Sequence, residues 1–534
     1  MKKLISATLA LCMVFTAVLF PLQAGAVETA DLKDAEVIRA EDYIEYVNED
    51  KGNDWALAIQ RMIEDAKAIN AGGDVPVVIS FPEGTYDIYE DQAYKKELYI
   101  SNTVGANQDY KIKNIGFLFE GMKNVVLEGN GSLFMFHGRM MTFAAIDCTN
   151  VTYQNLSFDF KVPSVIDVTV ESVNEGGRSV TVVVPECFNY EVNGTTVTWK
   201  SDVSPYSGNT YWTATNALAN VANQIYDANT GLTVRAGTKL FNGLSSISEI
   251  SDHKLKLTYS GNVPDNVKAG CSYQMRNTTR DHSAMFFWKS EGVTLKDVNA
   301  HFLYGFGVVG QNSSDITLDG VHFDVPEGSG RSTAGFADFV QMSGCRGEIR
   351  VENCTFVNPH DDPINIHGTF MRVVRKSSDN KTFTVRYMHN ETAGFPNFFE
   401  GDQVEFMTAG NMTRVADSVA TVVDVKGPSG DAGAQQSGTG SLTDIEITLD
   451  RALPDISPNT HVVENITYTP NAVIQNNVFK QVPTRGILVT TRKKVEIKDN
   501  LFDGMGMASI YISNDAQGWY ESGPVEDVTI EGNT

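Results

Sequence analysis

One short phrase recurs along the chain and limits what it can fold into: an alternating apolar strand, a Gly or Asn, and then a Phe or a small residue. Equivalent apolar positions of consecutive copies, such as Leu295, Leu318 and Val351, lie 23 or 33 residues apart. Repeats of this length with period-two alternation are typical of a β-solenoid, in which each copy forms one coil and inward side chains stack between coils. The copies are NVVLEGNGSLF (124–134), NVTYQNLSFDF (150–160), GVTLKDVNAHF (292–302), DITLDGVHFDV (315–325), EIRVENCTFVN (348–358), NAVIQNNVFKQ (471–481), KVEIKDNLFDG (494–504) and a final DVTIEGNT.

Three stretches depart from this repeat. Residues 54–69 carry apolar positions at helical spacing, and we expect this helix to cap the first open edge of the solenoid rather than to form a separate small domain. From about 161 to 280, and again from about 369 to 469, the phrase disappears and alternating strands separated by turn residues take its place. These two segments predict inserted antiparallel modules, small barrels or sandwiches, which we expect on the same side of the solenoid.

The N-terminus has the pattern of an export signal. Lys2 and Lys3 precede an apolar run that ends near Leu22, and the small-residue site AGA follows at 24–26. This pattern is typical of a cleaved signal peptide, and no second apolar run of membrane length follows it. We therefore expect an exported protein, secreted or at the cell surface, or periplasmic where the host has an outer membrane.

The interruptions divide the chain into segments with different expected roles. Because the sequence stops inside a coil phrase, we also expect further coils beyond Thr534. The segments are a signal peptide (1–26), an N-terminal cap with the first coils (27–160), an inserted β module (161–280), central coils with a catalytic wall (281–368), a second inserted β-barrel module (369–469) and C-terminal coils (470–534).

Charge and cysteine content exclude several classes of partner. The formal net charge is −24 and the pI is near 4.8, whereas nucleic acid or an anionic membrane surface would require a basic face. Apart from Cys12 in the signal segment, five cysteines are scattered through the chain without a C-x-x-C pair. An odd, scattered set predicts neither a disulfide framework nor a zinc site. We expect no metal and no cofactor.

Three aspartates fall into one column when two strand sequences, ADFVQMSG and DDPINIHG, are aligned. Setting the inward-facing Val340 over Ile364 places Asp338 over Asp362, 24 residues further along, with Asp361 beside them. Stacked strands are about 4.8 Å apart, so the carboxyl groups cannot all ionise freely and at least one pKa should rise. This is a suitable environment for a general acid beside a general base. The alternative is structural, because aspartates in solenoid turns often bind local backbone N–H groups.

The same alignment places other polar side chains around the aspartates. The strand TRGILVTT puts Arg485 at the aspartate position, and the alternation turns Phe339 outward together with the polar candidates. A metal site built from the two nearby histidines and Asp361 lacks a third nitrogen or sulfur ligand. The candidates for binding sugar hydroxyl groups are Gln341, Asn365, His367, Arg485 and His360. Candidates for an aromatic platform under a sugar ring are Trp288, Tyr304 and Trp519.

The motifs ADFVQMSGC and VENCTFVNPHDDPINIHGTF resemble those of glycoside hydrolase family 110, the exo-acting α-1,3-galactosidases. The resemblance implies an all-β fold, a right-handed parallel β-helix (solenoid) interrupted by two β-barrel insertions behind a secretion signal. It also implies inverting hydrolysis of a terminal α-1,3-linked galactose, as on blood-group B and linear Gal-α-1,3-Gal glycans. The family's catalytic aspartates match Asp338, Asp361 and Asp362, and we expect Asp361 to be the general acid while the other two hold the water.

Two other readings of the sequence stay open. A polygalacturonase-like hydrolase or a Ca²⁺-dependent polysaccharide lyase could use the same fold and a similar acidic cluster with a nearby basic residue. A non-catalytic glycan-binding adhesin could also be built on a β-solenoid. In each case the expected partner is a glycan, here one with a terminal α-galactose, and a homodimer is a further possibility.

Overall fold

The computed structural model describes residues 35–71, 75–103, 110–174, 176–215, 222–237, 239–277, 279–389, 391–429 and 442–534. The predicted signal peptide and most of the Gly-rich segment 427–441 lie outside these residues. Within the described ranges, no helix is long and apolar enough to cross a membrane.

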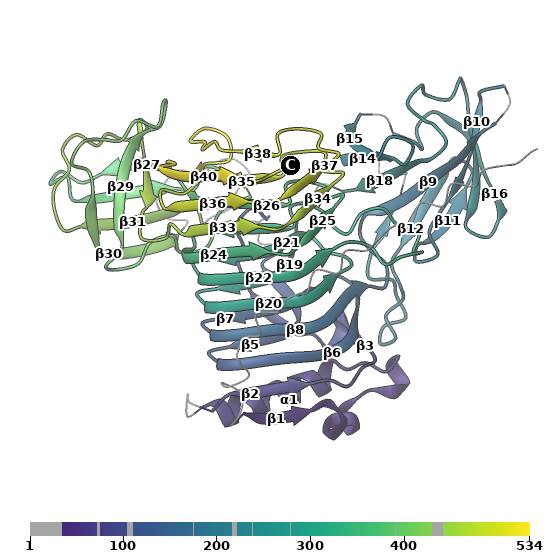
Figure 1. Ribbon diagram of the computed structural model, residues 1–534, viewed down its shortest axis with the longest axis horizontal. Coiled ribbons are helices and arrows are strands. Elements are labelled where there is room, and N and C mark those ends of the chain that lie inside the picture. The colour runs from purple at the N-terminus through teal and green to yellow at the C-terminus, as the bar shows by residue number, and fades with distance from the viewer. Residues whose placement is uncertain are drawn as a thin grey trace, which may run out of the picture.

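The repeat folds as a parallel β-helix whose coils stack along one axis (Figure 1). In the longer of its two sheets, Leu295 pairs with Leu318 and Leu318 with Val351, so the spacing of the phrase is the register of the coils. This confirms the predicted solenoid. The strands of this sheet are β1 (Glu36–Arg39), β2 (Val77–Ser80), β3 (Thr85–Tyr89), β6 (Lys123–His137), β8 (Thr149–Phe160), β20 (Glu291–Ala300), β22 (Ser314–Phe323), β24 (Arg346–Glu352), β25 (Thr355–Val357), β33 (Asn471–Gln475), β34 (Val478–Lys480), β36 (Lys494–Lys498), β37 (Leu501–Asp503) and β40 (Asp527–Glu531).

The second sheet forms the opposing wall of each coil. Its strands pair in parallel except at two edges, where β4 and β39 run antiparallel to their neighbours β5 and β26. The strands are β4 (Tyr94–Glu97), β5 (Ile112–Glu120), β7 (Met141–Ile146), β19 (Ser283–Trp288), β21 (Phe306–Gln311), β23 (Val340–Ser343), β26 (Ile364–Thr369), β35 (Ile487–Val489), β38 (Ile510–Tyr511) and β39 (Glu521–Ser522).

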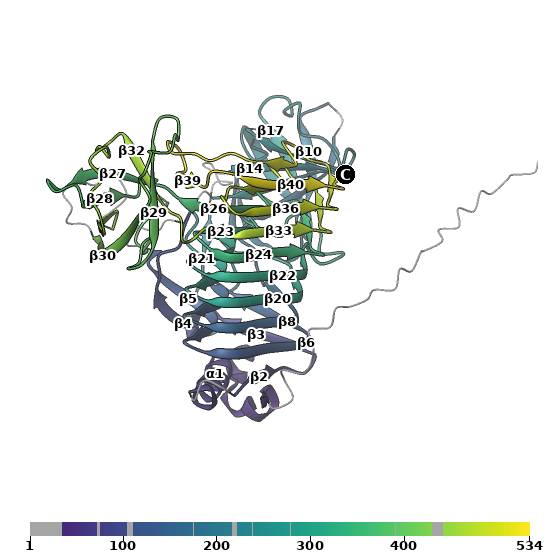
Figure 2. The same ribbon diagram turned by 60° about the vertical axis from the view of Figure 1, so that its left-hand side comes forward.

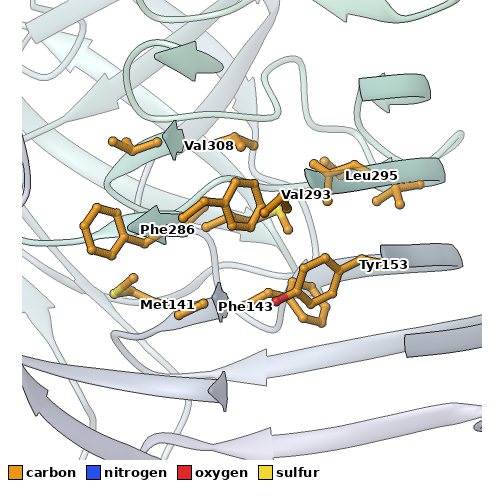
Figure 3. Packing of buried hydrophobic residues seen from close by; sticks show 14 of the residues in the cluster. Met141, Phe143, Tyr153, Phe286, Val293, Leu295 and Val308 are labelled. Atoms are coloured by element: carbon orange, nitrogen blue, oxygen red, sulfur yellow. The ribbon is translucent and has the colours of Figure 1, made fainter. Parts of the chain in front are cut away.

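The core between the sheets is built from stacked equivalents. Figure 3 shows Phe143 of β7 and Tyr153 of β8 facing each other across the coil, and their ring centroids are 5.3 Å apart. The last Phe of the phrase forms a second stack, in which Phe356 lies 5.0 Å from Phe323 and 4.9 Å from Phe479. Because each coil repeats the same inward residues, burial of apolar surface fixes the register of the whole solenoid.

A helix closes the N-terminal end, as the sequence predicted. The helix α1 (Ala56–Asn70) buries Ile59, Met62 and Ile63 in the main apolar core, beside the first coil. Figure 1 shows it under β1 and β2, where it covers the open end of the stack. Short 3-10 helices surround it: η2 (Ala40–Tyr46), η3 (Glu49–Lys51) and η4 (Glu90–Gln92).

The first insertion leaves the solenoid after β8. It is an antiparallel sheet in the order β15–β14–β18–β9–β10–β17–β16, with a smaller sheet β11–β12–β13 that shares its apolar core. The smaller sheet makes the module a sandwich, one of the two predicted forms. The strands are β9 (Ile166–Val173), β10 (Ser179–Val183), β11 (Asn189–Asn193), β12 (Thr196–Lys200), β13 (Thr213–Ala214), β14 (Ala222–Asp227), β15 (Leu232–Ala236), β16 (Leu244–Ser251), β17 (Lys254–Tyr259) and β18 (Cys271–Arg276).

The second insertion is a closed antiparallel barrel in the order β27–β28–β31–β30–β29–β32. Figures 1 and 2 show the two modules on different flanks of the solenoid, so the prediction that they share one side is wrong. The first leaves from the longer sheet and the barrel leaves from the end of β26 in the other sheet, so they emerge at different corners of the coil. The barrel strands are β27 (Met371–Lys376), β28 (Thr382–Arg386), β29 (Gln403–Thr408), β30 (Ala420–Ser429), β31 (Asp444–Leu449) and β32 (His461–Asn465).

Candidate active site

The second sheet aligns the aspartates as the sequence predicted. Val340 of β23 pairs with Ile364 of β26, which places Asp338 and Asp362 at equivalent positions just before the two strands. The backbone N–H of Phe339 donates to the Asp362 carbonyl over 3.2 Å. On the next coil, Gly307 approaches this turn so closely that a Cβ would lie 2.3 Å from the Asp338 carbonyl oxygen. The glycine therefore lets the coils meet at the carboxylates.

Asp362 is buried and bound to Arg485 on the following coil. The Arg485 guanidinium donates to Asp362 Oδ2, and its backbone N–H lies 3.3 Å from Oδ1. Burial and the neighbouring charge of Asp361 raise the pKa of Asp362 to about 6, against the opposing effect of Arg485. An aspartate with this pKa is a stronger base than usual and is still mostly ionised at neutral pH.

Asp338 is buried more completely in charge-poor surroundings. Burial, followed by the charges of Asp361 and Asp362, raises the pKa of Asp338 well above its usual range. Because its carboxyl group has no such guanidinium partner as the one on Asp362 among the ion pairs of the described residues, burial acts on it with little compensation. The cluster therefore holds a proton at a pH where isolated aspartates are fully ionised.

Asp361 differs from its two neighbours because it is partly open and paired with arginines. Its side chain is 19% exposed, and its two oxygens lie 2.9 Å from Arg235 Nη2 and 3.4 Å from Arg280 Nη2. Both arginines come from the first insertion or from the segment that returns from it to β19. The insertion thus supplies the cations that face the most accessible carboxyl group of the cluster.

Arg280 is itself held on several sides. Its Nη1 lies 3.6 Å from Glu391, which belongs to the barrel insertion. Its guanidinium carbon is 5.0 Å from the ring centroid of Phe306 and 5.6 Å from that of Trp519. The indole of Trp519 also stacks on His389, with 4.1 Å between the ring centroids. These groups bring both insertions and the C-terminal coils to the same wall of the solenoid.

Three polar residues predicted to face outward are buried beneath a C-terminal segment. Gln341, Asn365 and His367 lie on β23 and β26, and β39 pairs antiparallel with the end of β26. Glu521 of β39 accepts a hydrogen bond from Asn365 Nδ2 over 3.3 Å and lies 3.7 Å from His367 Nε2. The side-chain amide of Gln341 has no hydrogen-bond partner among the described residues. Such an unpaired buried amide is available to a hydroxyl group of a ligand.

His360 faces the first insertion. Its Nδ1 accepts a hydrogen bond from Arg276 Nε over 3.2 Å, and its backbone oxygen accepts one from Arg235 over 3.2 Å. Burial and the charges of Arg276 and Arg235 lower the pKa of His360 well below its usual value, so the ring is neutral. It is held as a support for Arg276, and its predicted contact with substrate stays a prediction.

Among the three aromatic candidates, the structure brings Trp519 to the cluster. Trp519 is 41% exposed and contacts Arg280. Tyr304 is buried in the main core beside Phe160, and Trp288 packs against the same core. Phe339, predicted to face outward, instead stacks on Phe323 inside the solenoid. The turn before β23 breaks the strand alternation there, so the two-residue period does not apply to Phe339.

Several residues of the site could not be found by aligning coils. Arg235, Arg280 and Glu391 come from the insertions, where the solenoid register does not extend, and no motif marks them. Glu521 lies on β39, which runs antiparallel to the coil strands and so has no equivalent in the repeat. The parallel β-helix and the carboxyl cluster on one wall define a β-helix protein of the carbohydrate-active class.

Comparisons with known proteins give the family. Residues 382–429 match the family described as GLAA-B beta-barrel domain II. Alpha-1,3-galactosidase A of Streptomyces avermitilis is 46% identical over 484 residues, which cover 90% of this chain and 75% of that protein. Alpha-1,3-galactosidase A of Bacteroides thetaiotaomicron is 36% identical over 462 residues, covering 86% of this chain and 76% of that protein. Among solved structures, the A-module of a mannuronan C-5 epimerase from Azotobacter vinelandii is 10% identical, with a TM-score of 0.31 and coverage of 93% and 77%. The chain belongs to the α-1,3-galactosidase family and is a glycoside hydrolase.

Proposed function

We propose that the protein removes terminal α-1,3-linked galactose from glycans by exo-acting, inverting hydrolysis. The names of its relatives support the substrate class. The observation that carries the mechanism is the cluster itself, in which Asp338 and Asp362 are buried with raised pKa values beside the more open Asp361. Separate environments for neighbouring carboxyl groups are what acid and base roles require.

Asp361 is proposed as the proton donor. It is the carboxyl group of the cluster nearest to solvent, where a glycosidic oxygen can reach it. As the C–O bond breaks, its proton passes to the leaving oxygen and a carboxylate remains. Arg235 and Arg280 then stabilise the carboxylate, since charge-assisted hydrogen bonds to a developing anion lower the barrier.

Asp338 and Asp362 are proposed to hold the attacking water. Water adds to the anomeric carbon from the face opposite the leaving group and gives its proton to one of these carboxylates, so the anomeric configuration is inverted. Inverting glycosidases separate acid and base by about 6.5–9.5 Å to leave room for this water. Side chains that diverge from turns about one strand spacing apart can reach that separation. Because the pKa of Asp362 is about 6, it accepts the proton more readily than an ordinary aspartate.

Polar side chains around the cluster are proposed to bind the galactose hydroxyl groups. The amide of Gln341 and the Oδ1 atom of Asn365 are buried without a partner among the described residues. Arg485 is held beside Asp362, and His367 is held by the carbonyl oxygen of Gly368 at 2.6 Å. A sugar that pairs with these groups removes the cost of leaving them unsatisfied, which favours binding of a polyhydroxylated ring.

Product analysis tests this proposal. Wild-type protein and Asp361→Asn are incubated with α-1,3-, α-1,4- and α-1,6-linked galactosides and with polygalacturonate, and NMR follows the anomer released. We expect β-galactose from the α-1,3 substrates and loss of this activity in the variant. Arg350→Gln, on the outer face of β24, serves as the matched control. Cleavage of polygalacturonate, or an unsaturated product that requires calcium, would instead assign a pectin-type hydrolase or lyase.

Export is proposed from residues 1–26, which have the pattern of a signal peptide. N-terminal sequencing of the protein recovered outside the cytoplasm tests it, and the expected first residue lies just after Ala26. An intact Met1 on the cellular protein would contradict export. Self-association stays a prediction, which light scattering on the purified protein can check.

A further inference from the structure

We propose that Arg280 is a positioning residue for the reaction, a fixed guanidinium clamp that sets the orientation of Asp361. The inference deepens the proposed function and rests on the role of Asp361 as proton donor. It assigns to Arg280 no contact with the reacting bond.

The contacts of Arg280 restrain it in every direction that matters for this role. The guanidinium lies near the rings of Phe306 and Trp519, at 5.0 Å and 5.6 Å from their centroids. Its two terminal nitrogens point to different carboxylates, with Nη2 toward Asp361 and Nη1 toward Glu391. Only 11% of the side chain is exposed. A planar cation packed by rings and tethered to a second carboxylate is pre-organised, so little entropy is lost when it holds Asp361.

Arg235 shows by contrast what a less restrained partner looks like. It approaches Asp361 more closely, at 2.9 Å, but its side chain is 55% exposed. Its other described contact is with the backbone oxygen of His360. An exposed ion pair is screened by water and contributes little to fixing a geometry. Arg235 can therefore move aside when a sugar enters, whereas Arg280 stays in place.

The clamp also explains why the site needs parts far apart in the sequence. Arg280 lies where the first insertion returns to β19, Glu391 lies in the barrel insertion, and Trp519 lies just before β39. Asp361 stands on a turn of the solenoid and has no strand hydrogen bonds of its own to fix its side chain. The insertions supply that restraint. Misplacing a reacting group by about 1 Å can cost about 100-fold in rate, so this restraint has catalytic weight.

Leaving-group dependence separates a positioning role from a structural one. Rates of Arg280→Ala and Arg280→Lys are measured on an α-1,3-linked digalactoside, which needs a proton donor, and on 2,4-dinitrophenyl α-galactoside, which does not. We expect kcat on the digalactoside to fall about 100-fold in Arg280→Ala, with KM little changed, and kcat on the activated substrate to fall far less. Arg280→Lys should recover part of the loss because the charge is kept. Arg350→Gln is the control, and thermal unfolding verifies that each variant is folded.

Two results would overturn the inference. An equal loss on both substrates would mean that Arg280 supports the structure or binds the sugar, and no loss on either would mean that the clamp is idle. Asp361→Asn in the same assay separates the two levels of the argument. If that variant keeps the activated substrate while Arg280→Ala loses both equally, the clamp fails and the proposed role of Asp361 stands. If Asp361→Asn loses both substrates equally, the proton-donor role itself fails and the clamp falls with it.

Discussion

Arg485 binds Asp362 from the adjacent coil through two different donors, its backbone N–H and its guanidinium. The contact follows from the register in which Ile364 pairs with Ile487, so the pair is built into the stacking of the solenoid. Burial and the charge of Asp361 raise the pKa of Asp362, and Arg485 opposes that rise. The arginine therefore sets the pH at which this carboxylate becomes available as a base.

The first prediction concerns the acid side of the pH profile. Because the pKa of Asp362 is about 6, kcat/KM should decline as the pH falls below that value and the base is protonated. Arg485→Gln removes the opposing cation, which raises the pKa of Asp362 and moves this limb to higher pH. Activity at neutral pH should drop about tenfold for each unit of the shift. Initial rates between about pH 4 and pH 9 check it, and an acid limb that stays in place in the variant would contradict the assignment.

A second prediction concerns stability at Asp338. Its pKa in the folded protein is raised, so it stabilises the fold fully only below the unfolded pKa and that contribution is lost as the pH rises through the folded pKa. Asp338→Asn should therefore unfold at higher denaturant concentration than wild type at pH 8 and at a similar concentration near about pH 4. Each unit of raised pKa is worth about 1.4 kcal/mol. Denaturant titrations at both pH values measure the difference, and the variant should be inactive. A variant less stable than wild type at pH 8 would argue against a costly buried carboxyl group.

The solenoid part of this site was predictable because its register is encoded locally. Alternation of apolar and polar residues fixes which side chains of each strand face inward, and inward residues must stack on their equivalents. Aligning Val340 with Ile364 was therefore enough to bring Asp338 beside Asp362. The same reasoning failed at Phe339, which lies in a turn where the strand period does not operate.

The remaining part depends on docking between modules, which sequence periodicity does not encode. Arg280 and Glu391 meet near Asp361 only because two insertions with separate apolar cores fold back on one wall. The burial of Gln341 and Asn365 likewise follows from β39, an antiparallel strand outside the repeat. Contacts of this kind are set by the shapes of packed modules, and no spacing in a single sequence reports them.

A third prediction tests the ladder of asparagines inside the C-terminal coils. Asn500 donates to the Ile474 carbonyl over 3.0 Å and accepts from the backbone N–H of Asn477, also at 3.0 Å. Asn500→Ala leaves these buried backbone groups unpaired, so the free energy of unfolding should fall by about 2–4 kcal/mol. Denaturant unfolding measures it, with Glu348→Gln on the exposed face of β24 as the control. A loss no greater than that of the control would mean that the ladder contributes little.

The last prediction concerns a histidine that joins the first insertion to the N-terminal coils. His137, at the end of β6, lies 2.6 Å from Asp202 in the insertion and 2.8 Å from Asp87 on β3. Its ring stacks on Tyr89 with 3.9 Å between centroids. Burial lowers its pKa, but the hydrogen bonds and charges of Asp202 and Asp87 outweigh burial and raise the pKa above the usual value. The imidazolium therefore bridges the two carboxylates.

The sign of the pH effect follows from that raised pKa. The stabilisation is fully present below the unfolded pKa near 6.5 and is lost as the pH rises through the higher folded pKa. His137→Gln should lower the free energy of unfolding by about 2 kcal/mol near pH 6, where the charged hydrogen bonds are complete, and by clearly less near about pH 9. Unfolding by denaturant at the two pH values measures both differences. A deficit of equal size at both would show that the ring is held by packing on Tyr89, because packing does not titrate, and the charged bridge would then contribute nothing.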